Sequence, residues 1–112
     1  MDRYKKAASF ADRIEQELRK LNVWQEEPPS DSAFDSEEAF FADTMTFYQW
    51  LQFVLLERIR EIVEEEGEFP DDSMVGAYAV RELDGISEAS DLIQLLSEFD
   101  DFITGPAASP PA

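Results

Sequence analysis

The sequence lacks cysteine and histidine altogether, and only nine of its 112 residues are lysine or arginine. Without cysteine there are no disulfides, no thiolate nucleophile and no thiolate metal site. Without histidine there is no imidazole for general acid–base chemistry or for a Ser-His-Asp triad. Carboxylates, hydroxyls, tyrosine, lysine and arginine are what remains for catalysis. We therefore expect no enzyme, no catalytic residues, no metal site and no cofactor.

Long apolar runs are also missing. The longest nearly uninterrupted run, residues 47–56, contains Gln49 and Gln52. It is far shorter than the roughly 20 residues that a membrane span needs. Residues 1–18 carry charges throughout and contain no apolar stretch of the kind found in signal peptides. We expect a cytoplasmic protein that does not contact a membrane.

Length and composition favour one globular domain. Apolar residues make up 44% of the chain and aromatic residues 12%, which is typical of a folded protein. A chain of 112 residues has room for a single core. We expect this domain to cover residues 1–104, followed by a flexible tail rich in alanine and proline at residues 105–112.

The charge is strongly negative and unevenly distributed. The net charge is −17, from 26 acidic and nine basic residues. The first 22 residues contain six of the nine bases and four acids, so the rest of the chain carries −19. Such a field repels phosphate backbones and attracts basic proteins, so we expect no direct nucleic-acid binding and a possible basic protein partner. The simpler alternative is that the acids only keep the protein soluble.

Helical periodicity dominates the pattern of apolar residues. The first predicted helix covers residues 4–21, with apolar side chains every three or four positions, and Asn22 is a typical end. Residues 23–38 contain two consecutive prolines among serines and acids. This composition predicts a long loop, which Trp24 and Phe34 should hold in place.

The second predicted helix begins at Thr46, which stands in the capping-box relation to Gln49. It continues to about Glu66, and Gly67 is the expected stop. On a wheel of 100° per residue one face should be core, namely Phe47, Leu51, Val54, Leu55, Ile59 and Ile62. Three large apolar residues fall outside that face, namely Trp50, Phe53 and Leu56.

Two further helices complete the predicted fold. Residues 74–83 form a short helix that Asp72 or Ser73 can cap, although Gly76 weakens a helix interior by about 1 kcal/mol. Ser87 should cap the last helix, whose apolar stripe comprises Leu92, Leu95, Leu96, Phe99, Phe102 and Ile103. The sequence thus predicts an all-α fold, an antiparallel up-and-down four-helix bundle with a long loop between its first two helices.

One block of the sequence carries a family resemblance. A phenylalanine pair is followed by Asp-Thr-Met, then Trp-Leu-Gln and a later arginine, at Phe40, Phe41, Asp43, Thr44, Met45, Trp50, Leu51, Gln52 and Arg58. Trp24 ahead of an acidic loop, Pro70, and an Ala-Tyr-Ala stretch before the last helix agree with it. In these features the chain resembles the YqcC-like family of small bacterial proteins.

The resemblance implies an all-α four-helix bundle and no particular catalytic activity. Genes of this family often lie beside that of a tRNA pseudouridine synthase, which implies this RNA-modifying enzyme as a candidate partner. The present sequence departs from its relatives in its more acidic body and its alanine and proline tail.

Aromatic side chains near the second helix are the first candidate site. Phe41, Trp50 and Phe53 could form an exposed patch that binds a partner protein. The more economical alternative is that the preceding loop folds back over the helix, with Phe34 and Phe40 as anchors, and covers the patch.

Three consecutive acids at the end of the second helix, Glu64, Glu65 and Glu66, are candidates for docking a basic surface. Their spacing does not match a calcium-binding loop. A solvated acidic face is the simplest interpretation.

A small-molecule pocket between the loop at residues 24–45 and the second helix is the alternative site. Its candidate lining residues are Asp43, Thr44, Gln52 and Arg58. Arg58 falls beside the apolar face of the wheel, where a guanidinium needs a carboxylate such as Asp43. The pair is either a buried clasp between loop and helix or a recognition site for a carboxylate or phosphate ligand.

These observations leave three hypotheses. The first is a non-enzymatic accessory or adaptor protein that binds a basic partner, for which the resemblance supplies the pseudouridine synthase. The second is a small-molecule binder or weak enzyme that uses the pocket just described. The third is a mimic of DNA, which needs carboxylates spaced like phosphates along one face.

Overall fold

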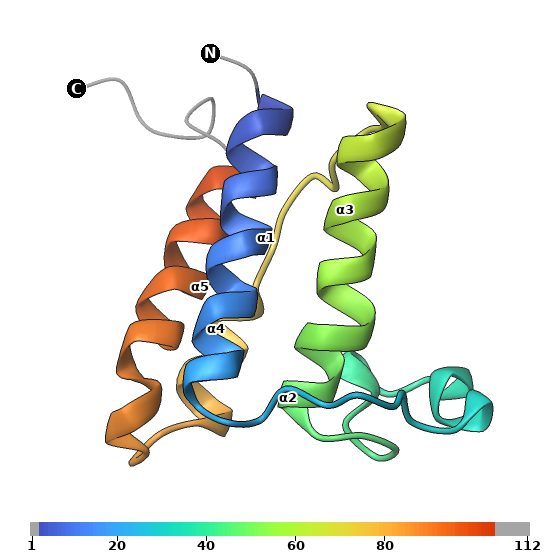
Figure 1. Cartoon of the computed structure of the whole chain (residues 1–112), viewed down its shortest axis with the longest axis vertical. Coiled ribbons are helices and arrows are strands. Elements are labelled where there is room, and N and C mark those ends of the chain that lie inside the picture. The colour runs from blue at the N-terminus through green and yellow to red at the C-terminus, as the bar shows by residue number, and fades with distance from the viewer. Residues whose placement is uncertain (1–2, 105–112) are drawn as a thin grey trace.

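A computed structural model describes residues 3–104, which form an all-α bundle (Figure 1). The elements in chain order are α1 (Arg3–Lys20), η1 (Asp31–Asp35), η2 (Ala39–Phe41), α2 (Phe47–Trp50), η3 (Leu51–Leu55), α3 (Leu56–Glu65), α4 (Val75–Glu82), η4 (Ser87–Ala89) and α5 (Ser90–Thr104). No strand occurs within residues 3–104, and the predicted fold class is confirmed. The predicted tail at residues 105–112 lies outside the described residues. None of the described helices is long and apolar enough to cross a membrane.

The helix α1 follows its apolar stripe. The buried side chains are Ala7, Phe10, Ala11, Ile14 and Leu18. The chain leaves the helix at Asn22, which adopts a left-handed conformation with φ of 63°. Asparagine tolerates this conformation better than most residues, which explains why the helix stops where the sequence predicts.

The segments α2, η3 and α3 form one continuous helical rod with a wide turn in it. At its start, the backbone N–H of Gln49 donates to the Thr46 side chain, and the Gln49 side chain accepts from the Thr46 N–H, so the predicted capping box is present. In η3 the chain makes a π turn, in which the N–H of Leu56 donates to the carbonyl of Leu51.

The π turn changes which face of the rod is buried. A π turn winds fewer degrees per residue than an α-helix. Beyond it, the side-chain directions therefore lag those of a regular α-helix by roughly one residue. Leu56, expected outside the core, is only 1% exposed, whereas Val54 and Ile62 are only half-buried. The predicted core face is therefore wrong for these three residues.

The end of α3 also differs from expectation. Glu66, rather than Gly67, adopts the left-handed conformation, with φ of 50°. The N–H of Gly67 donates to the carbonyl of Ile62 at 2.9 Å, which closes the last turn. The observed stop, at Glu66, thus lies one residue earlier in the chain than the predicted stop at Gly67.

The helices are arranged around α1, which lies between α3 and α5 and packs against both (Figure 1). The pairing with α3 is reinforced by Arg60, which contacts Glu15 at 2.7 Å and Asp12 at 3.5 Å. By contrast, α3 and α5 make no extended contact with each other. The chain after α3 runs back across this open seam to α4 (Figure 1).

The short helix α4 is attached to α5 by hydrogen bonds between the start of α4 and a side chain of α5. The carboxylate of Asp100 accepts hydrogen bonds from the N–H groups of Val75 and Gly76, at 2.9 and 2.7 Å. The Ser73 hydroxyl donates to the same carboxylate at 2.5 Å. Neither Asp72 nor Ser73 caps the helix as predicted, because α5 supplies the acceptor.

The last helix buries the predicted stripe of six apolar residues. Its predicted cap is wrong, since Ser87 lies in the 3-10 turn η4 and its hydroxyl donates to Glu88 instead. The predicted stop at Gly105 and Pro106 lies outside the described residues.

The long loop gathers around α2, at the start of the helical rod (Figure 1). Gln52, the one buried polar side chain found in the described core, holds the loop in place. Its amide donates to the Gln25 carbonyl at 2.7 Å and accepts from the Gln25 N–H at 2.9 Å. Trp24 packs against the core, and the guanidinium of Arg19 lies over its ring, 4.5 Å from the ring centre.

Candidate functional site: a groove beside α3

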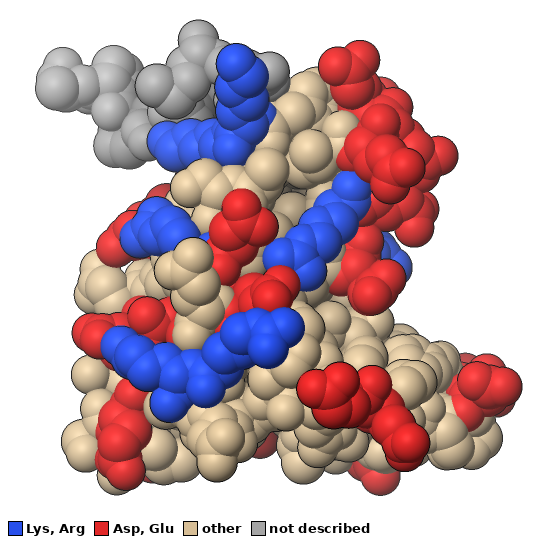
Figure 2. All heavy atoms as spheres, viewed as in Figure 1, with Lys and Arg blue, Asp and Glu red and all other residues tan. Residues whose placement is uncertain are grey.

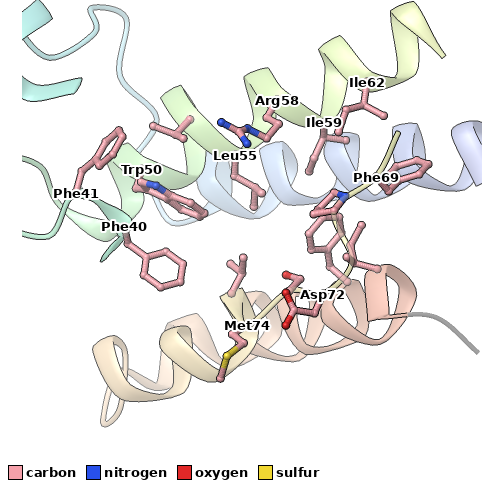
Figure 3. Close-up of a pocket in the computed structure, with 16 residues that line it drawn as sticks. Phe40, Phe41, Trp50, Leu55, Arg58, Ile59, Ile62, Phe69, Asp72 and Met74 are labelled. Carbon is pink, nitrogen blue, oxygen red and sulfur yellow. The ribbon is translucent and has the colours of Figure 1, made fainter. Parts of the chain in front are cut away.

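The open seam between α3 and the α4–α5 pair contains a cavity of about 310 Å³. Leu55 of η3 and Ile59 of α3 face Phe99 and Ile103 of α5 across it. Most of its wall is apolar, and these four side chains are buried. Figure 3 shows aromatic side chains at both ends, with Phe69 opposite the group formed by Phe40, Phe41 and Trp50.

The aromatic group at one end depends on an unusual backbone. Phe40 and Phe41 both adopt left-handed conformations, with φ of 56° and 52°. Such conformations cost bulky residues on the order of 1 kcal/mol or more each, so the packing around them must compensate. Phe40 stacks on Tyr78 of α4 with ring centres 4.1 Å apart and meets Trp50 at 4.7 Å. Phe41 packs against Phe34 instead, with ring centres 6.4 Å apart.

A second hollow of about 650 Å³ adjoins the cavity. Both hollows are lined by Phe41, Val54, Arg58, Ile62, Phe69 and Pro70. We call the two hollows together the α3 groove. The second hollow adds Phe34, Phe53 and three acids, namely Glu57, Glu61 and Glu68.

The groove combines an apolar floor with an acidic rim. Glu57, Glu61 and Glu68 border one side, and Asp72 lies at the other. All four are exposed. Arg58 is the single base among its described lining residues. Figure 2 shows acidic side chains gathered at the far end of α3, while basic side chains lie mainly over α1.

The structure divides the predicted partner-binding residues into two groups. Phe41 and Trp50 line the cavity, and Phe53 lines the second hollow, all three half-buried. The acids Glu64, Glu65 and Glu66 are exposed at the end of α3 and line neither hollow. The loop covers part of the predicted patch, because Phe40 packs on Trp50 with ring centres 4.7 Å apart, and Phe34 and Phe40 are half-buried as expected of its anchors.

The structure does not bring the four predicted pocket residues together. Arg58 is exposed and has no hydrogen bond or ion pair to any described residue, so the predicted clasp with Asp43 is wrong. Asp43 instead accepts a hydrogen bond from Ser36. The Thr44 hydroxyl donates to the Ala33 carbonyl at 2.7 Å, and Gln52 is buried against the loop backbone.

Asp43 and Thr44 border a separate hollow of about 620 Å³, which Phe40 also lines. Tyr48 also lines it. Burial raises the pKa of the Tyr48 phenol, and the charge of Glu88 acts in the same direction. No cluster of three or more acidic side chains among the described residues is placed to hold a metal ion.

Several groove residues could not be identified from the sequence. The apolar pattern assigns Val54 and Ile62 to the core, because the π turn leaves no mark in it. Met74 is 66% exposed at the edge of the cavity. Phe69 offered one signal, as a single aromatic residue in an otherwise acidic stretch.

Fold and groove define a small all-α bundle with an open, acid-rimmed seam. Residues 6–102 match the family described as tRNA pseudouridine synthase C (DUF446), and the chain belongs to that family. An uncharacterized protein of Haemophilus influenzae is 35% identical over 80 residues, which cover 71% of this chain and 73% of that protein. The uncharacterized protein YqcC of Escherichia coli is 34% identical over 67 residues, 60% of this chain and 57% of YqcC. The resemblance noted in the sequence is thereby confirmed.

Two further comparisons concern the fold and a longer protein. The solution NMR structure of YqcC from E. coli superposes with a TM-score of 0.82 at 24% identity, over 100% of this chain and 96% of that one. A tRNA pseudouridine synthase C of Pectobacterium carotovorum is 42% identical over 57 residues. That match covers 51% of this chain but 15% of the synthase.

Proposed function

We propose that this chain is a non-enzymatic, cytoplasmic accessory protein that binds a basic protein partner, with a tRNA pseudouridine synthase as the first candidate. The observation that carries the proposal is the α3 groove, an apolar surface rimmed by acids on a protein of net charge −17. Exposed apolar grooves mark protein interfaces, and a one-signed field around them selects partners of opposite charge.

The choice of partner is supported by the Pectobacterium synthase. A stretch similar to 57 residues of this chain occurs within that much longer protein. Segments that are joined in one chain in one organism often act together when they are separate chains. This supports an association between the present chain and a synthase.

The side chains of the groove also favour binding over catalysis. Its walls are chiefly aromatic and aliphatic, and its acids are exposed on the rim. General acid–base catalysis needs titratable groups held in contrasting environments, for example one desolvated carboxyl beside an ionised one. The rim offers no such contrast.

The proposal is tested by co-purification of the chain with purified tRNA pseudouridine synthase C from the same genome over a salt series. We expect binding that weakens about tenfold or more between 50 and 500 mM salt. Reversing Glu64 and Glu65 to lysine should weaken it further, whereas reversing Glu26 and Glu27, two acids in the loop, should have less effect. Absence of binding at low salt contradicts the proposed partner.

A small-molecule binder is the second candidate, and the cavity itself favours it. Its volume of about 310 Å³ lies at the lower end of the range for ligand pockets, roughly 300–1,000 Å³. Convergent polar groups are few, because Arg58, Asp72 and Ser73 are the main polar side chains that line it. Saturable one-to-one binding of an apolar dye that the synthase cannot displace would support this function over the first.

A further inference from the structure

The two sides of the α3 groove differ in chemistry. The cavity is apolar, with Leu55 and Ile59 on its floor and the half-buried Ile62 at its edge. The adjoining hollow presents Glu57 and Glu61 from α3. A ligand that fills both must therefore be apolar on one side and cationic on the neighbouring side.

The spacing of side chains along η3 and α3 matches a helical ligand. Val54, Arg58 and Ile62 lie four residues apart, as do Glu57 and Glu61. Each step of four residues is about 6 Å along the axis, one turn of a helix. A second helix lying along α3 repeats its own side chains at the same interval, so its ridges can meet these rows.

From this geometry we infer that the α3 groove receives a single amphipathic helix of the partner. Its apolar anchors, spaced three or four residues apart, enter the cavity, and its lysines or arginines face Glu57, Glu61 and Glu68. Charge complementarity selects this occupant, because the described lining residues of the groove include four exposed acids and one base, Arg58. The inference rests on the proposed function and specifies its binding site.

The test uses the intact protein and a synthetic probe, an 18-residue peptide of leucine and lysine with a helical apolar period. A scrambled peptide of equal composition has the same charge without the apolar face. The amphipathic peptide should bind about tenfold more tightly or better, because burying one large apolar side chain contributes about that much. Equal affinity for both peptides would show attraction by charge alone and overturn the inference.

Apolar variants locate the site. Ile62→Ser should weaken binding of the amphipathic peptide about tenfold. The matched control is Ile86→Ser, because Ile86 is 41% exposed and lies outside both hollows of the groove. Circular dichroism confirms that each variant is folded. An equal effect of both substitutions contradicts binding in the groove.

Charge variants test the rim without touching the core. At low salt, Glu61→Lys should weaken binding of the amphipathic peptide about fivefold, and Arg58→Gln should strengthen that binding about twofold. The controls are Glu27→Lys and Arg81→Gln, exposed residues that line neither hollow. If Arg58→Gln weakens binding, the groove takes an anionic ligand and the inference is wrong.

The inference and the proposed function can fail separately. If the synthase binds the protein but Ile62→Ser and Glu61→Lys leave that binding unchanged, the groove is not the docking site although the partner is right. If the peptide binds in the groove and the synthase does not bind at all, the proposed partner is wrong, whereas the groove still stands as a binding site for an amphipathic helix. Sedimentation equilibrium of the protein alone, showing a dimer that Ile62→Ser dissociates, would assign the groove to a second copy and overturn the inference.

Discussion

The carboxylate of Asp100 on α5 accepts a hydrogen bond of 2.7 Å from the backbone N–H of Gly76 on α4. The first N–H groups of a helix have no partner within it, so an acceptor must come from elsewhere. A Cβ atom at Gly76 would lie 2.6 Å from the Cα of Ser97, so the two helices pack backbone to backbone at this point. Helix α4 therefore depends on α5 both for its cap and for its position.

Replacing Gly76 with alanine should destabilise the protein by about 2–3 kcal/mol. In an isolated helix the same change stabilises by about 1 kcal/mol. A loss of stability here therefore indicates that the added Cβ clashes with the backbone of α5 at Ser97. The free energy of unfolding from chemical denaturation measures it. Gly67→Ala is the matched control, because a Cβ there meets nothing closer than 4.0 Å, and its effect should stay within about 0.5 kcal/mol.

Asp100 should titrate above its usual pKa of 3.8, because burial raises the pKa more than its hydrogen bonds lower it. A raised folded-state pKa means that the fold favours the protonated carboxyl. The stabilisation that the protonated Asp100 carboxyl contributes is fully present below pH 3.8 and is lost as the pH rises through the pKa of the folded state. Relative to Asp100→Asn, the unfolding free energy of the parent should therefore decline over that interval. A carboxyl carbon NMR titration with a midpoint at or below 3.8 would contradict this.

Gln52→Leu should destabilise the protein by about 1–3 kcal/mol, because it leaves the N–H and carbonyl of Gln25 without their partners. Hydrogen exchange of the Gln25 amide should accelerate in the variant. The control is Gln94→Leu, which removes a single exposed hydrogen bond to Glu98. Unchanged exchange at Gln25 would show that Gln52 does not hold the loop.

Local patterns in the sequence predicted much of the fold. The capping box at Thr46, the left-handed Asn22 and the apolar stripe of α5 each involve residues within a few positions of one another. Such features are set by short-range physics, which is independent of the rest of the chain. The bounds of α1 and α4 followed from them to within about two residues.

The features that escaped prediction depend on distant partners. Nothing near Gly76 in the sequence indicates that a carboxylate 24 residues later caps α4. The π turn shifts the buried face by one residue, which moved Val54 and Ile62 from the expected core to the groove and exposed Arg58. The groove could not be predicted from the sequence for that reason. Phe41, Trp50 and Phe53, singled out as partner-binding candidates, line its two hollows, and their role in binding stays a prediction.

Methyl NMR of the intact protein with purified tRNA pseudouridine synthase C decides whether the groove is the docking surface. We predict that the methyl signals of Val54, Ile62 and Met74 shift or broaden on addition of the synthase at low salt and recover at high salt. Val80 and Ile86, which are 51% and 41% exposed and lie outside the groove, should stay unchanged. Shifts confined to Val80 and Ile86, or no shifts at all, would contradict a partner-binding role for the α3 groove.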